Sequence, residues 1–150
     1  MKRQVVLVFL LCGVILAGCS KLKPAFRKLA AAEVDANQKA VAEQVATKLL
    51  EGWRAGKFEA LGEEATLSMR KTFTAELQKS SYQEITGLFG EFKSMQYVES
   101  WAPNDGTLSV IHRFKASFAK SPATPEIRVV LDGNGKLSGL WLKPWEDKLR

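Results

Sequence analysis

The chain has 150 residues, with 22 lysines and arginines against 16 aspartates and glutamates, and a net charge of +6. This length fits one globular domain, and 46% hydrophobic with 25% charged residues excludes a disordered tail, a collagen-like chain and a multi-span membrane protein. Two cysteines and one histidine cannot supply a disulfide framework, a cysteine-rich zinc site or a two-histidine metal motif. We therefore expect no metal and no cofactor.

Residues 1–18 have the pattern of a secretory signal peptide. Lys2 and Arg3 precede an uncharged, mostly apolar run over residues 5–18. As a helix this run would span only ~21 Å, which is short of the ~30 Å hydrocarbon core of a bilayer. The pattern therefore favours a signal that is removed over a transmembrane helix.

The end of this run, Leu16-Ala17-Gly18-Cys19, resembles the bacterial lipobox. The resemblance implies cleavage between Gly18 and Cys19 and a diacylglyceryl thioether on Cys19, which would become the lipidated N-terminus. An ordinary small side chain at the end of a signal peptide is the alternative for Cys19. A single acyl chain gives only reversible attachment, whereas two or three hold a protein on a membrane.

The residue after the cysteine is Ser20, not the aspartate that resembles an inner-membrane retention signal. We therefore expect a lipid anchor in the cell envelope. In a host with two membranes it would lie in the outer membrane, facing the periplasm. In a host with one membrane it would lie on the outer face of the plasma membrane.

Residues 19–34 are interpreted as the lipidated cysteine followed by a basic tether. Its positive charges are Lys21, Lys23, Arg27 and Lys28. Such a segment is either a solvated spacer or an aid to adhesion, since a basic residue near an anionic lipid surface contributes up to about 1 kcal/mol.

The remaining residues, 35–150, are predicted to form an α+β domain that begins with helices. Asp35 with Gln38 resembles a capping box, and the helix that follows ends near Gly56. Its apolar stripe consists of Val41, Val45, Leu49 and Trp53, flanked by Ala42, Ala46 and Leu50. A short helical turn is expected over residues 58–61. Thr66 and Thr74 are expected to cap two further helices, the second of which carries Leu77, Ile85 and Leu88.

From Phe92 onward the apolar period changes to two, which is typical of strands. One face of the central strand is expected to carry Leu108, Val110, His112, Phe114, Ala116 and Phe118. Ile127, Val129 and Leu131 repeat the alternation, and residues 137–142 form another strand. Turn residues connect these runs at 103–106, 121–125 and 132–135. Helices followed by four hairpin-connected strands indicate an antiparallel meander covered on one face by the long helix.

Four segments, at residues 51–61, 73–78, 87–90 and 129–140, are similar to a bacterial family of unknown function with the nuclear-transport-factor-like (NTF-like, or cystatin-like) fold. The similarity extends over about residues 36–144. It implies a long N-terminal helix and short helices packed on a curved four-stranded antiparallel sheet, which together form a cone with an open mouth. Because the function of the family is unknown, the resemblance transfers no catalytic residue.

Five residues on the predicted strands are candidates for lining a ligand pocket: Tyr97, Trp101, His112, Phe114 and Trp141. The alternatives are core packing and a homodimer through the sheet. A homodimer would explain apolar residues on both faces of the last strand: Leu137 and Trp141 are expected on one face, and Leu140 and Leu142 on the other.

His112 is the single histidine of the chain. It can act as a general base or ligand contact near neutral pH, or it can be a neutral core residue that is hydrogen-bonded to the backbone. Glu99 and Glu126 have no partner that the sequence identifies. The charged residues Arg113, Lys115 and Arg128 are expected on a solvated face, and no nucleic-acid partner is expected.

The sequence therefore favours a lipid-anchored envelope protein whose non-enzymatic domain binds a partner protein or a small apolar ligand. Two alternatives stay open. One is a small acid–base enzyme that uses His112, and the other is a structural homodimer.

Overall fold

A computed structural model describes residues 25–120 and 124–149 of the chain. The elements in chain order are β1 (Phe26–Lys28), a short 3-10 helix η1 (Ala31–Glu33), α1 (Ala36–Arg54), α2 (Leu67–Thr72), α3 (Ala75–Phe89), β2 (Phe92–Pro103), β3 (Val110–Phe118), β4 (Pro125–Leu131) and β5 (Leu137–Pro144). The expected signal peptide, its cleavage site and Cys19 lie outside the described residues. Within the described residues, no helix is both long and apolar enough to cross a membrane.

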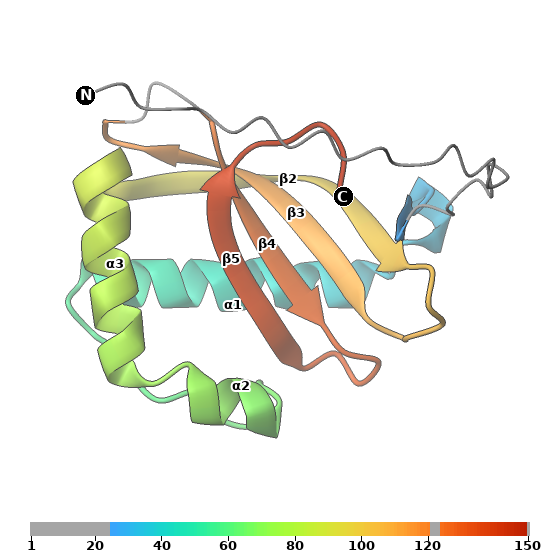
Figure 1. Ribbon diagram of the computed structural model, residues 1–150, viewed down its shortest axis with the longest axis horizontal. Helices are drawn as coiled ribbons and strands as arrows, with labels where there is room; N and C mark the ends of the chain where they lie inside the picture. The colour runs from blue at the N-terminus through green and yellow to red at the C-terminus, as the bar shows by residue number, and fades with distance from the viewer. Residues whose placement is uncertain (1–24, 121–123, 150) are drawn as a thin grey trace, which may run out of the picture.

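The five strands form one antiparallel sheet in the order β1-β2-β3-β4-β5 (Figure 1). The predicted α+β class and antiparallel meander are confirmed, but the prediction of four strands is wrong. The additional strand is β1, which lies in the segment 19–34 that was interpreted as a tether. Strand β1 has three residues, which are too few to show the alternation of a strand. It pairs with the C-terminal end of β2: Arg27 pairs with Ala102, and the Leu29 N–H donates to Ser100 O at 2.9 Å.

Helix α1 crosses one face of the sheet, which we call the inner face (Figure 1). Its predicted N-cap is confirmed, because the Asp35 carboxylate accepts hydrogen bonds from the backbone N–H groups of Asn37 at 2.7 Å and Gln38 at 2.9 Å. The buried side chains of α1 are Ala42, Ala46, Leu50 and Trp53, whereas Val41, Val45 and Leu49 are only partly buried. Small alanines at the contact allow a close approach of helix and sheet, which explains why the flanking row is buried more deeply than the predicted one.

The segments after α1 agree only in part with the prediction. Thr66 and Thr74 do cap α2 and α3, through hydrogen bonds from Met69 N–H at 3.2 Å and Leu77 N–H at 3.3 Å. Residues 58–61 do not form the predicted helical turn. Helix α3 carries the three apolar residues expected of it: Ile85 packs against the core, whereas Leu77 is 46% exposed and Leu88 is 71% exposed.

Strand β5 is one edge of the sheet, and a register shift at Leu131 interrupts its pairing with β4. Because one extra residue in a strand reverses the alternation that follows, Leu137, Leu140 and Leu142 all pack against the inner core. Trp141 lies on the opposite, outer face, paired with Arg128. The prediction that Leu137 and Trp141 share a face is therefore wrong.

Candidate binding groove between α3 and β5

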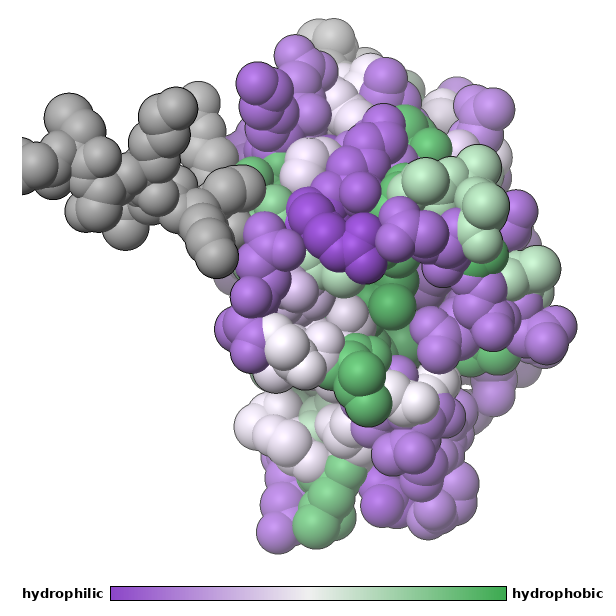
Figure 2. All heavy atoms as spheres, turned by 90° about the vertical axis from the view of Figure 1, so that its right-hand side faces the viewer, coloured by the Kyte–Doolittle hydropathy of each residue, from purple (hydrophilic) through white to green (hydrophobic). Residues whose placement is uncertain are grey.

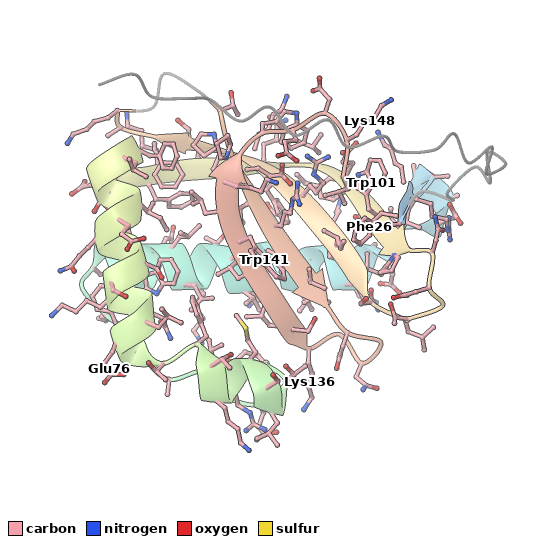
Figure 3. The ribbon with its side chains drawn as sticks, viewed as in Figure 1. Phe26, Glu76, Trp101, Lys136, Trp141 and Lys148 are labelled. Carbon is pink, nitrogen blue, oxygen red and sulfur yellow. The ribbon has the colours of Figure 1, made fainter. Side chains whose placement is uncertain are left out.

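A cavity of about 250 Å³ lies between α3 and the edge strand β5. We call it the α3–β5 groove. Its lining is mostly apolar and consists of Leu50, Trp53, Phe73, Ser81, Glu84, Ile85, Ile127, Leu140, Trp141 and Leu142. Figure 3 labels Trp141 on β5, and α3 lies to its left in this view. A concave apolar site with few polar groups is the usual form of a ligand pocket.

The wall formed by Trp53 is held in place by a buried hydrogen-bond network around Gln78. The Trp53 indole N–H donates to Gln78 Oε1 at 2.9 Å. The Gln78 amide in turn donates to Glu59 O at 2.7 Å and to Phe73 O at 3.1 Å. The Phe73 and Tyr82 rings each lie 5.9 Å from the Trp53 ring. Because each polar atom of Gln78 is satisfied, this wall is preorganised and does not depend on a ligand.

Two polar side chains give the groove its chemical character. Ser81 and Glu84 both extend from α3, and among the described residues Glu84 is the only charged one that lines the cavity. No ion pair involving Glu84 is found in the described part of the chain. The groove is thus apolar within and carries one unpaired negative charge.

A second cavity of about 270 Å³ lies on the other side of Trp53, between α1 and the segment before α2. Its charged residues are Lys48, Lys57, Glu59 and Glu64. The Gly62 N–H donates to Glu64 at 3.0 Å, and this hydrogen bond together with the charge of Lys48 lowers the pKa of the Glu64 carboxyl. Opposite charges in this second cavity balance one another, so it selects less clearly for a ligand than the α3–β5 groove.

The five pocket candidates of the sequence analysis do not come together in one site. Tyr97, His112 and Phe114 lie on the inner face, where the Tyr97 and Phe114 rings meet edge to face at 5.8 Å. Trp101 lies on the outer face near Phe26, at the β1 end of the sheet, far from Trp141 (Figure 3). Of the five, Trp141 lines the groove.

His112 belongs to a buried hydrogen-bond chain. Its side chain is 1% exposed, its Nδ1 lies 2.9 Å from Ser100 Oγ, and Ser100 Oγ lies 2.9 Å from the Tyr97 hydroxyl. Burial lowers the pKa of His112 to about 4, although the negative charge of Asp35 opposes this shift. His112 is therefore neutral at physiological pH and is a core residue, hydrogen-bonded to a side chain and not to the expected backbone carbonyl.

Two of the three basic residues expected on a solvated face, Arg113 and Arg128, instead belong to an ion-pair cluster on the outer face, whereas Lys115 is exposed as expected. Arg113 is fully buried and donates to Glu126 through Nε and Nη2, both at 2.7 Å, and to Glu99 through Nη1. Arg128 also donates to Glu126, and Lys28 Nζ lies 2.7 Å from Glu99. Arg113 is thus the partner that the sequence did not identify for both glutamates.

The two carboxyls of this cluster remain ionised. Burial raises the pKa of Glu126, but hydrogen bonds and charge from Arg113 and Arg128 outweigh burial, so the pKa is lowered overall. At Glu99 burial is likewise outweighed, by Lys28, Trp101 and Arg113, and its pKa is lowered. Neither glutamate is poised to exchange protons near neutral pH.

The C-terminal segment, residues 145–149, covers this cluster. The Trp145 ring lies 4.1 Å from the Arg113 guanidinium carbon and 4.7 Å from Lys115 Nζ, and Glu146 O accepts a hydrogen bond from Arg113. Leu149 is buried, at 8% exposure. Part of the outer face considered for a homodimer is therefore occupied by the chain's own C-terminus.

The end of the molecule that carries β1, opposite α3, has a largely hydrophilic surface. Figure 2 looks onto the side that carries β1, the start of α1 and the β2–β3 loop, and shows hydrophilic side chains that break the hydrophobic area into small patches. Within residues 25–120 and 124–149, no group of three or more His, Cys, Asp or Glu side chains is arranged to hold a metal ion.

Comparisons with known proteins give no match. No family model matches the chain, and no curated protein or solved structure is significantly similar to it.

Sequence reasoning missed the groove because residues from α1, α3, β4 and β5 build it together. One feature of the sequence pointed to the groove. The long helix at residues 36–54 already covers the sheet, so the apolar residues Leu77, Ile85 and Leu88 of the later helix have no partner that the sequence identifies.

Proposed function

We propose that this chain is a lipid-anchored protein of the bacterial cell envelope whose domain binds an apolar group in the α3–β5 groove. The observation that carries the binding function is an apolar cavity of about 250 Å³ with a preorganised Trp53 wall. The support for the lipid anchor is the sequence Leu16-Ala17-Gly18-Cys19 behind a charged start and an apolar run.

We further propose that the domain has the NTF-like fold. A long helix across the inner face of a single antiparallel sheet supports this proposal. The α3–β5 groove would then be the mouth of the cone that the family resemblance implies.

The chemistry of the ionisable groups favours binding over catalysis. A neutral, buried His112 with a pKa of about 4 is a poor general base for a reaction near neutral pH. Glu99 and Glu126 are both held by Arg113. The acid–base enzyme that uses His112 is therefore the weaker candidate.

The binding proposal is tested with N-phenyl-1-naphthylamine, an apolar probe that becomes fluorescent in a dry pocket. Trp53 and Trp141 line the groove, so we expect energy transfer from tryptophan to the bound probe. Ile85→Lys places a charge in the groove and should weaken probe binding at least tenfold. Leu108→Lys is the matched control, because Leu108 is 80% exposed in the β2–β3 loop, far from the groove. Equal binding by both variants would contradict the proposal.

The anchor is tested by mass spectrometry of the native N-terminus and by membrane fractionation. Cys19→Ser should give an unprocessed or unlipidated product, whereas Cys12→Ser should be processed and retained on the membrane like the wild type. A native N-terminus without acyl groups would show that the anchor is wrong and would leave the binding proposal intact.

A further inference from the structure

Helix α3 presents a stripe beside the groove that continues past the cavity lining at both ends. At about 100° per residue, Leu77, Ser81, Glu84, Ile85 and Leu88 share one face of the helix. Three of these residues line the groove, and the apolar ones at the two ends, Leu77 and Leu88, are exposed. The stripe extends over roughly 16 Å, which is about the length of a five-residue strand.

The other side of the groove is an unpaired strand edge. Leu137 turns its backbone outward, since its N–H donates to Glu64 O at 2.8 Å and its C=O accepts from Thr66 N–H at 2.9 Å. In a strand, residues whose side chains share a face turn their backbone groups to the same edge. Leu140 and Leu142, which lie on the inner face like Leu137, therefore also point their N–H and C=O groups outward. In the described part of the chain, no strand pairs with them there.

The chain itself shows that this edge accepts an added strand. Ala65 forms an isolated parallel bridge with Leu137, and then Thr66 begins α2 and leads the chain away. Pairing therefore stops where the groove begins. Beyond this point the edge offers two donors and two acceptors next to an apolar cavity.

We infer that the α3–β5 groove binds an extended segment of a partner polypeptide, which adds to β5 as a further strand. This inference rests on the proposed function, because it identifies the apolar group in the groove as a side chain of that segment. The added strand would pair with Leu140 and Leu142, place an apolar side chain in the cavity and cover Leu77 and Leu88 of α3. A basic residue of the segment would complement Glu84.

A small apolar molecule fits these observations less well. It would fill the cavity but would leave the backbone groups of Leu140 and Leu142 unpaired, and it would not cover Leu88, which is 71% exposed. An extended peptide satisfies the backbone groups, the cavity and the exposed stripe together.

In the first test, short random peptides are selected for binding to the full-length protein as cells produce it. We expect enrichment of peptides in which apolar residues alternate with polar ones and include lysine or arginine. Hydrogen exchange with a selected peptide should slow at the Leu140 and Leu142 amides. The amides of Trp141 and Lys143 face β4 and should change little. Failure to select such peptides, or protection without this alternation, would overturn the inference.

The second test uses a matched pair of substitutions at Leu142. Leu142→Pro and Leu142→Ala both shorten the side chain, but only proline removes the outward N–H, and proline is tolerated on an edge strand. We expect Leu142→Pro to bind the selected peptide five- to tenfold more weakly than Leu142→Ala. Glu84→Gln should reduce the preference for basic peptides without loss of stability. Equal affinity of the proline and alanine variants would overturn strand addition.

Two outcomes identify other occupants. Binding of N-phenyl-1-naphthylamine without binding of any peptide would overturn this inference and leave the proposed function in place; absence of both would overturn both. A concentration-dependent dimer in sedimentation that Leu142→Pro abolishes and Leu142→Ala preserves would show that the occupant is a second copy of this chain, and would overturn a separate partner.

Discussion

Arg113 and Glu126 are joined by two parallel hydrogen bonds of 2.7 Å on neighbouring strands, and the side chains of both residues are fully buried. This bidentate geometry is the strongest form of a guanidinium–carboxylate contact. Glu99 accepts from the same guanidinium, so Arg113 links two buried carboxylates, which Lys28 and Arg128 also contact.

We predict that Arg113→Met destabilises the fold by about 3–5 kcal/mol, because it leaves two carboxylates buried without their shared partner. Urea unfolding followed by circular dichroism measures the free energy of unfolding. The control is Lys115→Met, two residues along the same strand, which should cost less than about 1 kcal/mol because Lys115 is exposed. Similar values for the two variants would contradict the role given to Arg113.

Acid should destabilise the protein in two separable pH ranges. His112 has a pKa of about 4 in the folded state and 6.5 as its ordinary value, so the unfolded state binds its proton more readily. Stability is full above pH 6.5 and falls as the pH drops toward 4, by on the order of 3 kcal/mol. Below about pH 4.5, the lowered pKa values of Glu99 and Glu126 add a further loss as these groups are protonated.

The two ranges are distinguished by His112→Leu. This variant should have nearly constant stability between pH 6.5 and pH 5 and should still unfold on further acidification. Thermal unfolding monitored across this pH range is the measurement. If the wild type were equally stable at pH 7 and pH 4.5, the neutral, buried state of His112 would be wrong.

We predict that Gln78 stabilises the groove wall by holding Trp53 in place. Gln78→Leu keeps the approximate volume but removes the acceptor of the Trp53 indole and the donor of the Glu59 and Phe73 carbonyls. We expect a loss of about 2–4 kcal/mol, since buried polar groups are left unpaired. The near-ultraviolet circular dichroism of tryptophan should change. Gln83→Leu, at an exposed position of the same helix, should show neither effect.

Two glycines should respond oppositely to alanine. Gly90 has a φ of +79°, and a Cβ there would lie 2.9 Å from the Lys120 backbone nitrogen, so Gly90→Ala is strained and should cost about 1–3 kcal/mol. A Cβ at Gly87, in α3, meets nothing within 4 Å, so Gly87→Ala should stabilise the protein by about 0.5–1 kcal/mol. Differential scanning calorimetry of the two variants would show shifts of opposite sign; shifts of the same sign would contradict this packing.

Local rules predicted much of the fold. The caps at Asp35, Thr66 and Thr74 depend on a side chain and a backbone a few residues away, and all three are present. The strands from β2 to β5 follow from alternation. In contrast, the pairing of β1 depends on β2, some seventy residues further along the chain, and nothing within the three residues of β1 signals it.

The candidate site was predicted less well, because long-range contacts decide which side chains are buried. Arg113 occupies a polar position in an alternating strand, and such positions face solvent unless another segment covers them. In this protein Trp145, in the C-terminal segment, covers Arg113. Likewise, the exposed face of α3 does not by itself predict a groove, because β5, which forms the other wall, is distant in the sequence.

The order of the sheet places β1 and β5 at its two opposite borders. Four inter-strand spacings of about 4.8 Å separate them, or roughly 19 Å. Six residues lie between Cys19 and Phe26, so a lipid on Cys19 would keep the β1 border within about 25 Å of the bilayer surface. The tethered border and the open border would then point in different directions, leaving β5 accessible to polypeptides that approach from the aqueous compartment.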